Sequence, residues 1–126
     1  MSDETRAKFL AAIADRVRAD GVEEVYLFQP LKQGGQESGV AVVAVNETES
    51  TENRLAVYTA KYRLTLKGPE RGKWEFAMQA EADAPLVTVE KVVAGVQRRS
   101  GDAEEPEKIS GDAFRDQLPP SDVVTP

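Results

Sequence analysis

The feature that most constrains the fold is an alternation of apolar and polar residues through the middle of the chain. In residues 55–67 and 73–83 the even-numbered positions are apolar and the odd-numbered positions are mostly polar. These even positions hold Ala56, Tyr58, Ala60, Tyr62, Leu64 and Leu66, then Trp74, Phe76, Met78, Ala80 and Ala82. Because successive side chains of a β-strand point to opposite faces, each run predicts a strand with one buried and one exposed face.

The segment between the two runs contains Gly68, Pro69 and Gly72, which predicts a turn that joins the strands as an antiparallel hairpin. If Lys67 lies opposite Lys73, three apolar pairs face each other across the hairpin. The predicted pairs are Leu66 with Trp74, Leu64 with Phe76, and Tyr62 with Met78. A slip by one residue would turn every aromatic side chain toward water, so we expect a well-defined register.

Other periodicities locate the remaining elements. Apolar residues at three- and four-residue spacing predict a helix over residues 4–19, and residues 22–31 and 40–45 predict strands. Residues 40–45 are apolar at both parities, which indicates a central strand covered on both faces or nearly so. A second helix is predicted over residues 86–99, with a strand over 86–94 as the alternative, because the many valines lower helical propensity.

These elements predict one α+β domain over residues 1–99, with the order α-β-β-β-β-α. Consecutive antiparallel strands tend to pair with their neighbours, so the four strands are expected to form an antiparallel meander. The N-terminal and C-terminal helices are both expected to cover the one apolar face of this sheet, which gives a two-layer architecture.

The last part of the chain, residues 100–126, differs from the rest in charge. It carries two basic and seven acidic residues, so it holds −5 of the total charge of −6, and it is rich in Gly, Pro and Ser. This composition predicts a flexible acidic extension. Within it, residues 109–118 could form a short helix that presents Phe114 and Leu118 on one side, with Ile109 behind them. Two uses remain open for this segment: binding a partner protein through these three side chains, or docking on its own domain.

The chain has no cysteine and no histidine, which excludes several classes of site. Disulfides, thiolate nucleophiles, Cys-ligated zinc and Ser-His-Asp catalysis all need one of these side chains. No nucleophile–base pair and no cofactor motif is present, so we expect neither enzyme activity nor a cofactor. The acidic loop 46–53 contains no glycine for the tight turn of a calcium loop, so no metal site is expected.

Two further patterns favour simple structural roles. Residues 68–73 (GPERGK) lack the Gly-Lys-Ser/Thr ending of a phosphate-binding loop, and they lead into a strand rather than a helix. The exposed face of the hairpin is basic near its turn, but the chain as a whole is acidic, which favours a solvated surface. We therefore expect no binding of DNA or RNA.

The apolar face of the hairpin suggests a second possible function. Tyr58, Tyr62, Phe76 and Met78 could line a cavity for a small apolar ligand beneath the helices. A domain of this size, however, needs such side chains to fill its core. Alanines at positions 56, 60, 80 and 82 leave room at one end of the hairpin, where either a helix approaches closely or a pocket opens.

The chain begins with the polar sequence Met-Ser-Asp-Glu and has no apolar run long enough to span a bilayer. We therefore expect a cytoplasmic protein without membrane contact. The function that fits these observations is a non-catalytic protein-interaction module, adaptor-like or chaperone-like, whose partner is another protein or a second copy of the chain. The alternative is a carrier of a small apolar ligand.

Overall fold

The computed structural model describes residues 3–47, 54–81, 88–100 and 105–118. These residues form three α-helices, one short 3-10 helix (η1) and six β-strands. In chain order the elements are α1 (Asp3–Ala14), η1 (Ala19–Gly21), β1 (Val22–Leu27), β2 (Leu31–Gln33), β3 (Gln36–Glu47), β4 (Arg54–Thr65), β5 (Lys73–Ala80), α2 (Val89–Ser100), β6 (Glu107–Ser110) and α3 (Gly111–Gln117).

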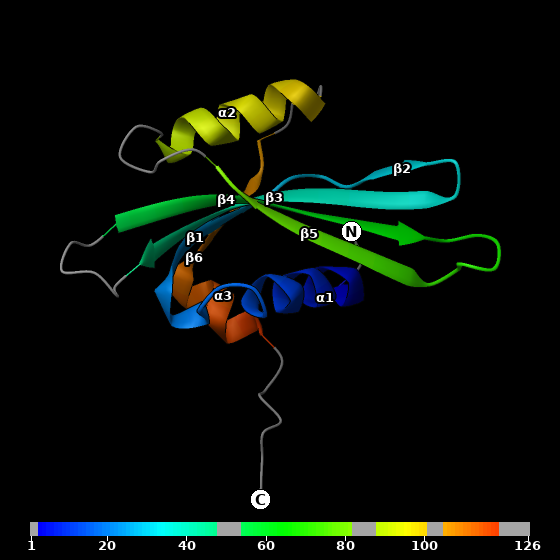
Figure 1. The fold of residues 1–126 in the computed structure, drawn as a ribbon, viewed down its shortest axis with the longest axis horizontal. Helices are drawn as coiled ribbons and strands as arrows, with labels where there is room; N and C mark the ends of the chain where they lie inside the picture. The colour runs from blue at the N-terminus through cyan, green and yellow to red at the C-terminus, as the bar shows by residue number, and fades with distance from the viewer. Residues whose placement is uncertain (1–2, 48–53, 82–87, 101–104, 119–126) are drawn as a thin grey trace, which may run out of the picture.

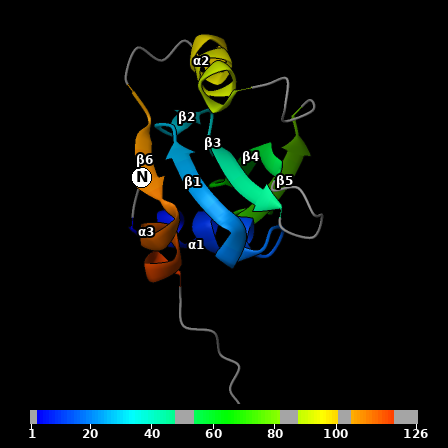
Figure 2. The same cartoon turned by 90° about the vertical axis from the view of Figure 1, so that its left-hand side faces the viewer.

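All six strands belong to one antiparallel sheet with the order β5-β4-β3-β1-β6, and β2 pairs with the first residues of β3. The longest strands, β3 and β4, pair along twelve residues, from Gln36 opposite Thr65 to Glu47 opposite Arg54. Helices lie on both sides of the sheet: α1 and α3 on one face, and α2 on the other (Figures 1 and 2).

Each face of the sheet has its own buried apolar cluster. Phe9, Leu10 and Ile13 of α1 pack with residues of the sheet and of α3 in the larger cluster. The smaller cluster lies under α2 and contains Phe28, Val42, Val57, Val92 and Val96. The neighbouring residues Val42 and Val43 are both fully buried, one in each cluster. β3 is therefore a central strand covered on both faces, as its apolar residues at both parities predict.

The expected fold class, α+β with an antiparallel sheet, is confirmed, but the arrangement of its elements differs from the prediction. The sheet has six strands rather than four, α3 is a third helix, and α2 packs on the face opposite to α1. The valines of β3 explain the position of α2, because placing both helices on one face would leave Val42 without cover.

Residues 89–100 form a helix and not the alternative strand. Four valines at helical spacing, Val89, Val92, Val93 and Val96, all pack in or against the cluster on this face. The hydroxyl of Thr88 accepts a hydrogen bond from the backbone N–H of Lys91 (3.3 Å) at the start of the helix. Burial of one side and a capped start outweigh the low helical propensity of valine.

The hairpin of β4 and β5 has the predicted faces, but its register is shifted by two residues. Thr65 rather than Lys67 lies opposite Lys73, and the facing apolar pairs are Leu64 with Trp74, Tyr62 with Phe76, and Ala60 with Met78. The turn is longer than predicted: strand pairing ends at Thr65, and the N–H of Gly72 donates to the carbonyl of Thr65 (2.6 Å), with Gly68 and Gly72 at positive φ (76° and 81°). A shift of two residues preserves the alternation, so every aromatic side chain stays on the expected face.

Part of the expected flexible extension belongs to the domain. β6 pairs with β1, and α3 packs under the same part of the sheet, so the sheet continues beyond residue 99. Phe114 is fully buried, Ile109 is 3% exposed, and Leu118 packs against the same cluster. The hydroxyl of Ser110 accepts a hydrogen bond from the N–H of Ala113 and caps α3. These side chains cover the domain's own core rather than facing outward toward a partner.

Close packing against the start of β1 holds α3 in place. A Cβ atom at Gly111 would lie 2.1 Å from the carbonyl oxygen of Val22, so only glycine fits there. The guanidinium of Arg115 donates to the carbonyl oxygens of Ala19 (3.0 Å) and Val22 (3.2 Å). Docking on its own domain is therefore the arrangement in this structure.

Replacement of Phe114 by alanine tests this docking. We expect Phe114→Ala to lower the free energy of unfolding by about 3–5 kcal/mol, because the change leaves a cavity in the core. The exposed neighbour Asp116 provides the control, and Asp116→Ala should change this free energy by less than about 0.5 kcal/mol. Urea unfolding followed by Trp74 fluorescence measures both. Equal midpoints for the two variants would contradict the burial of α3.

Candidate functional site

At the two ends of the described strand order lie β5 and β6, which differ in length and protection; the three-residue β2, which pairs with β3, lies off this order. β6 has four residues, and ion pairs join its side chains Glu107 to Arg6 (2.6 Å) and Lys108 to Glu24 (3.6 Å). β5 has eight residues and, among the described strands, pairs with β4 alone. A short, charged edge resists pairing with another chain, whereas a long, regular edge presents unpaired N–H and C=O groups. The unpaired side of β5, here called the open edge, is therefore the candidate site.

The hydrogen bonds between β4 and β5 identify the backbone groups that the open edge presents. The N–H of Glu81 donates to the carbonyl of Val57, which lies on β4 (2.8 Å). Hydrogen-bonded and non-hydrogen-bonded positions alternate along an antiparallel pair. Odd-numbered residues of β5 therefore direct their backbone groups toward β4. The even-numbered residues direct theirs outward, and these are Trp74, Phe76, Met78 and Ala80.

Three of these residues, Trp74, Phe76 and Met78, also form an apolar row on the face that α1 covers. All three side chains are half-buried. The rings of Trp74 and Phe76 stack with their centroids 5.6 Å apart and their planes at 4°. Phe9 of α1 lies closer to Tyr62 on β4 (4.7 Å between centroids) than to Phe76 (6.4 Å). Cover by α1 therefore decreases toward the open edge.

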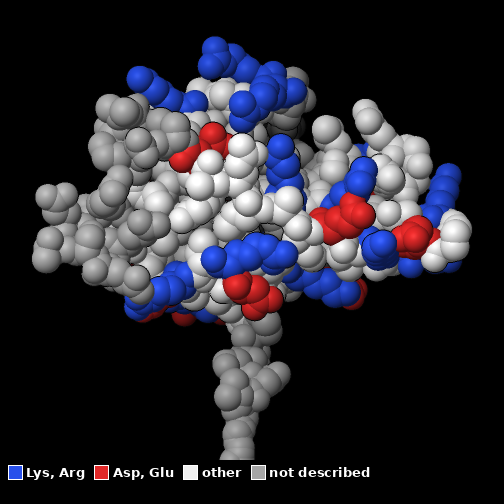
Figure 3. Space-filling view, viewed as in Figure 1, with Lys and Arg blue, Asp and Glu red and all other residues white. Residues whose placement is uncertain are grey.

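Two basic side chains lie over the rings of this apolar row. Lys8 Nζ is 5.5 Å from the ring centroid of Trp74, and the guanidinium carbon of Arg16 is 5.7 Å from that of Phe76. Arg16 also donates a hydrogen bond to the carbonyl of Ala12 (2.9 Å). Contacts of this kind contribute about 0.5–1 kcal/mol at exposed sites. Figure 3 shows uncharged atoms over the middle of β5, with basic and acidic side chains beside them.

The other face of β5 is polar, and its carboxylates are held by β4. Arg63 lies directly opposite Glu75 and pairs with it (2.7 Å), and these hydrogen bonds hold the pKa of Glu75 below its ordinary value. The hydroxyl of Thr59 donates to the carboxylate of Glu81. Between these two acidic residues lies Ala77, which is small and exposed. On this face, β4 thus holds the carboxylates of Glu75 and Glu81 in place, and the position of Ala77 between them carries no charge.

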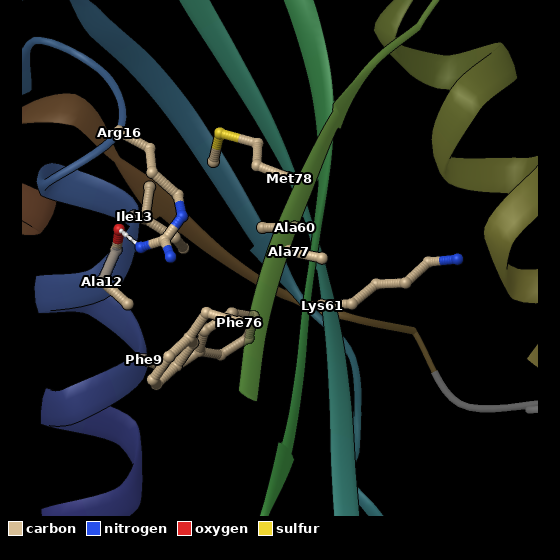
Figure 4. Close-up of a pocket in the computed structure, with 9 residues that line it drawn as sticks. All are labelled: Phe9, Ala12, Ile13, Arg16, Ala60, Lys61, Phe76, Ala77 and Met78. Carbon is tan, nitrogen blue, oxygen red and sulfur yellow. Dashed lines mark hydrogen bonds between the residues drawn. The ribbon is translucent and has the colours of Figure 1, made fainter. Parts of the chain in front are cut away.

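A small pocket lies between α1 and the sheet beside the apolar row (Figure 4). Its volume is about 10 Å³, which is room for about one water molecule. Its walls include Ala12 from α1 and Ala60 from β4. Of the four alanines expected to leave room beneath a helix, Ala60 lines this very small pocket, and Ala82 lies outside the described residues.

Two of the four residues expected to line a ligand cavity, Phe76 and Met78, border this pocket. Tyr62 is 2% exposed and donates a hydrogen bond to the buried carboxylate of Glu37 (3.2 Å). Tyr58 is half-buried against the same core cluster. The four side chains share one face of the sheet, where Tyr62 is buried in the core cluster and Tyr58, Phe76 and Met78 pack against it.

Burial, together with the carboxylate of Glu37, raises the pKa of Tyr62 above its ordinary value of 10.0. Burial also raises the pKa of Tyr26 to about 12, with a contribution from its hydrogen bond to Glu24. Both phenols are therefore protonated at neutral pH and act as hydrogen-bond donors. This arrangement stabilises the fold and supplies no general base.

These raised pKa values predict a loss of stability in alkaline solution. A tyrosine of the unfolded chain ionises near pH 10.0, whereas Tyr62 and Tyr26 stay protonated to higher pH in the fold. Above this pH the unfolded chain binds fewer protons than the folded chain, so the free energy of unfolding falls as the pH rises. Urea unfolding at about pH 9 and about pH 11 measures the decrease.

The matched variant for this prediction is Tyr62→Phe. At about pH 9 it should lower the free energy of unfolding by about 1–3 kcal/mol, because the buried carboxylate of Glu37 loses its donor. The further decrease toward about pH 11 should be smaller in the variant than in the natural chain. If the free energy of unfolding falls equally in the two proteins between these pH values, the pKa of Tyr62 is not raised in the fold.

The open edge is not among the sites predicted from the sequence, although the sequence contains a signal for it. The alternation in residues 73–83 placed Trp74, Phe76 and Met78 on one face, and no further strand was expected to pair with them. The last strand of a meander is an edge, so the apolar row had to lie at the border of the sheet. The predicted binding residues Ile109, Phe114 and Leu118 lie together instead in and against the core.

Within the described part of the chain, no helix is long and apolar enough to cross a membrane, and no group of acidic side chains could hold a metal ion. No family model, curated protein or solved structure matches the sequence or the fold. The function therefore has to be argued from the chemistry of the open edge.

Proposed function

We propose that this protein is a non-catalytic protein-interaction module that binds an extended segment of its partner along the open edge of β5. The observation that supports this function is the outward-facing backbone of Trp74, Phe76, Met78 and Ala80 on an eight-residue edge strand. In binding by β-strand addition, main-chain hydrogen bonds supply affinity, and pockets for alternate side chains supply specificity. The open edge offers the main-chain groups, and the half-buried row of Trp74, Phe76 and Met78 offers an apolar surface for alternate side chains.

The side chains along the edge support a protein as the partner rather than a nucleic acid or a membrane. An added strand would direct every second side chain toward the apolar row, where Trp74 and Phe76 are only half-buried. Covering apolar area contributes about 25 cal/mol per Å². The remaining side chains of the added strand would lie on the polar face beside the Arg63–Glu75 pair. We propose a cytoplasmic location on the sequence evidence given above.

The alternative function, transport of a small apolar ligand, has less support. Sites for small molecules enclose about 300–1,000 Å³, whereas the pocket beside the apolar row has about 10 Å³. Enlarging it would require α1 to move away from the sheet and Phe9 to lose its contact with Tyr62. The proposed interaction at the open edge needs no such rearrangement.

A proline at position 78 tests the proposal. The N–H of Met78 points outward, so Met78→Pro removes an edge donor without removing a hydrogen bond to β4. Met78→Ala is the matched control, since it loses the same side chain and keeps the N–H. We expect a partner captured from a lysate by the natural chain and by Met78→Ala to be lost with Met78→Pro.

Hydrogen exchange on the captured complex gives the site of binding. The amides of Trp74, Phe76, Met78 and Ala80 should exchange quickly in a chain whose open edge is unpaired and slowly in the complex. Circular dichroism and thermal unfolding check that Met78→Pro is folded. Equal capture by the proline and alanine variants, with no change at these four amides, would disprove binding at the open edge.

A further inference from the structure

We propose that the strand added at the open edge is β5 of a second copy of this chain, paired antiparallel so that Ala77 faces Ala77 of its partner across a two-fold axis. This inference rests on the proposed function and names its partner. It follows from three properties of β5: the parity of its backbone groups, the order of its charges and the sizes of its side chains.

The backbone parity limits the possible registers. Even-numbered residues of β5 direct their N–H and C=O groups outward, so even residues of one copy must bond to even residues of the other. A two-fold axis that satisfies this condition near the middle of the strand passes through residue 75, 76, 77 or 78. In each case the interface is isologous, because the same residues meet in both directions.

The charges on the polar face select among these four registers. An axis at Glu75 would put two glutamates opposite each other, and an axis at Met78 would put Glu75 opposite Glu81; both arrangements are unfavourable. An axis at Phe76 would bring no opposite charges together within β5, since Arg71, which would lie opposite Glu81, belongs to the turn. An axis at Ala77 puts Lys73 of each copy opposite Glu81 of the other, which gives two pairs of opposite charge.

The positions of these charges fit that register. Thr59 holds the carboxylate of Glu81 near the sheet, and Lys73 lies at the other end of β5, where Glu70 in the adjoining turn is its neighbour (3.1 Å). The two charged residues thus lie at opposite ends of the same face. The middle of this face is the exposed methyl group of Ala77, which leaves space for a second alanine at the axis.

Side-chain size on the apolar face favours the same axis. It places Trp74 opposite Ala80 of the other copy and Phe76 opposite Met78, so large side chains meet smaller or more flexible ones. Contacts between methionine sulfur and an aromatic ring are favourable. The half-buried row of each copy would gain cover from the row of the other. The edge of β5 is therefore complementary to itself in hydrogen bonding, charge and size.

Disulfide trapping tests this geometry directly, because the chain contains no cysteine of its own. In the proposed dimer residue 77 occupies a non-hydrogen-bonded pair, with Cα atoms about 4.5 Å apart, within the range that a disulfide spans. Ala77→Cys should therefore oxidise with glutathione disulfide to a covalent dimer. Gln79→Cys is the matched control, exposed on the same face, but its two thiols would be separated by about 14 Å along the strands.

Sedimentation equilibrium of the full chain gives an independent readout without cross-linking. The natural chain should sediment as a dimer, and Ala77→Glu should raise the dissociation constant at least about tenfold, because two carboxylates would meet at the axis. Gln79→Lys should remain dimeric, because its new charge would lie opposite Glu75. Position 77 is exposed in the single copy, so the fold itself should tolerate the change.

Selective cross-linking through residue 77, together with a dimer weakened by Ala77→Glu, would support the inference. A monomeric natural chain, or equal cross-linking of the two cysteine variants, would overturn it. In that event the capture experiment still tests the proposed function. If Met78→Ala captures another protein and Met78→Pro does not, the open edge is a binding site for that protein. If Ala77→Glu weakens no dimer, and Met78→Pro captures the same proteins as Met78→Ala, both proposals are rejected.

Discussion

The burial of β3 on both faces is the constraint on which the rest of the fold depends. Its valines reach the cluster under α1 on one side and the cluster under α2 on the other. A strand with apolar side chains on both faces and neighbours on both sides cannot meet water anywhere along its middle. The chain therefore has to supply helices for both faces, and it does so with segments from opposite ends of the sequence.

The parts of the fold that could be predicted from the sequence are those set by local periodicity. Alternation fixed the faces of β4 and β5, and the apolar residues at both parities marked β3 as central. The prediction of two helices on one face failed because it treated α2 and β3 separately, although Val42 required cover. The predicted register was wrong by two residues because Leu66 and Lys67 do not pair with β5; the N–H of Leu66 bonds to the carbonyl of Gly35 instead.

The end of the sheet and the site were harder to predict, because both depend on contacts between distant segments. The acidic composition after residue 100 favoured an extension, yet the pairing of β6 with β1 and the burial of Phe114 outweigh that local signal. This pairing also explains why the two edges differ. The C-terminal segment occupies the β1 side of the sheet, and the described chain offers no corresponding strand for β5.

The contact between β1 and β6 also bears on how the protein is made. These strands are neighbours in space, but almost the whole sheet lies between them in the sequence, so bringing them together requires closing a very long loop. A nascent chain that has released β1 through β5 from the ribosome still lacks the cover that Ile109 and Phe114 provide for Val25 and Leu27. A chain whose translation stops before β6 would thus expose part of the apolar face of the sheet. Such a chain would be bound by chaperones or degraded by proteases rather than form a smaller stable domain.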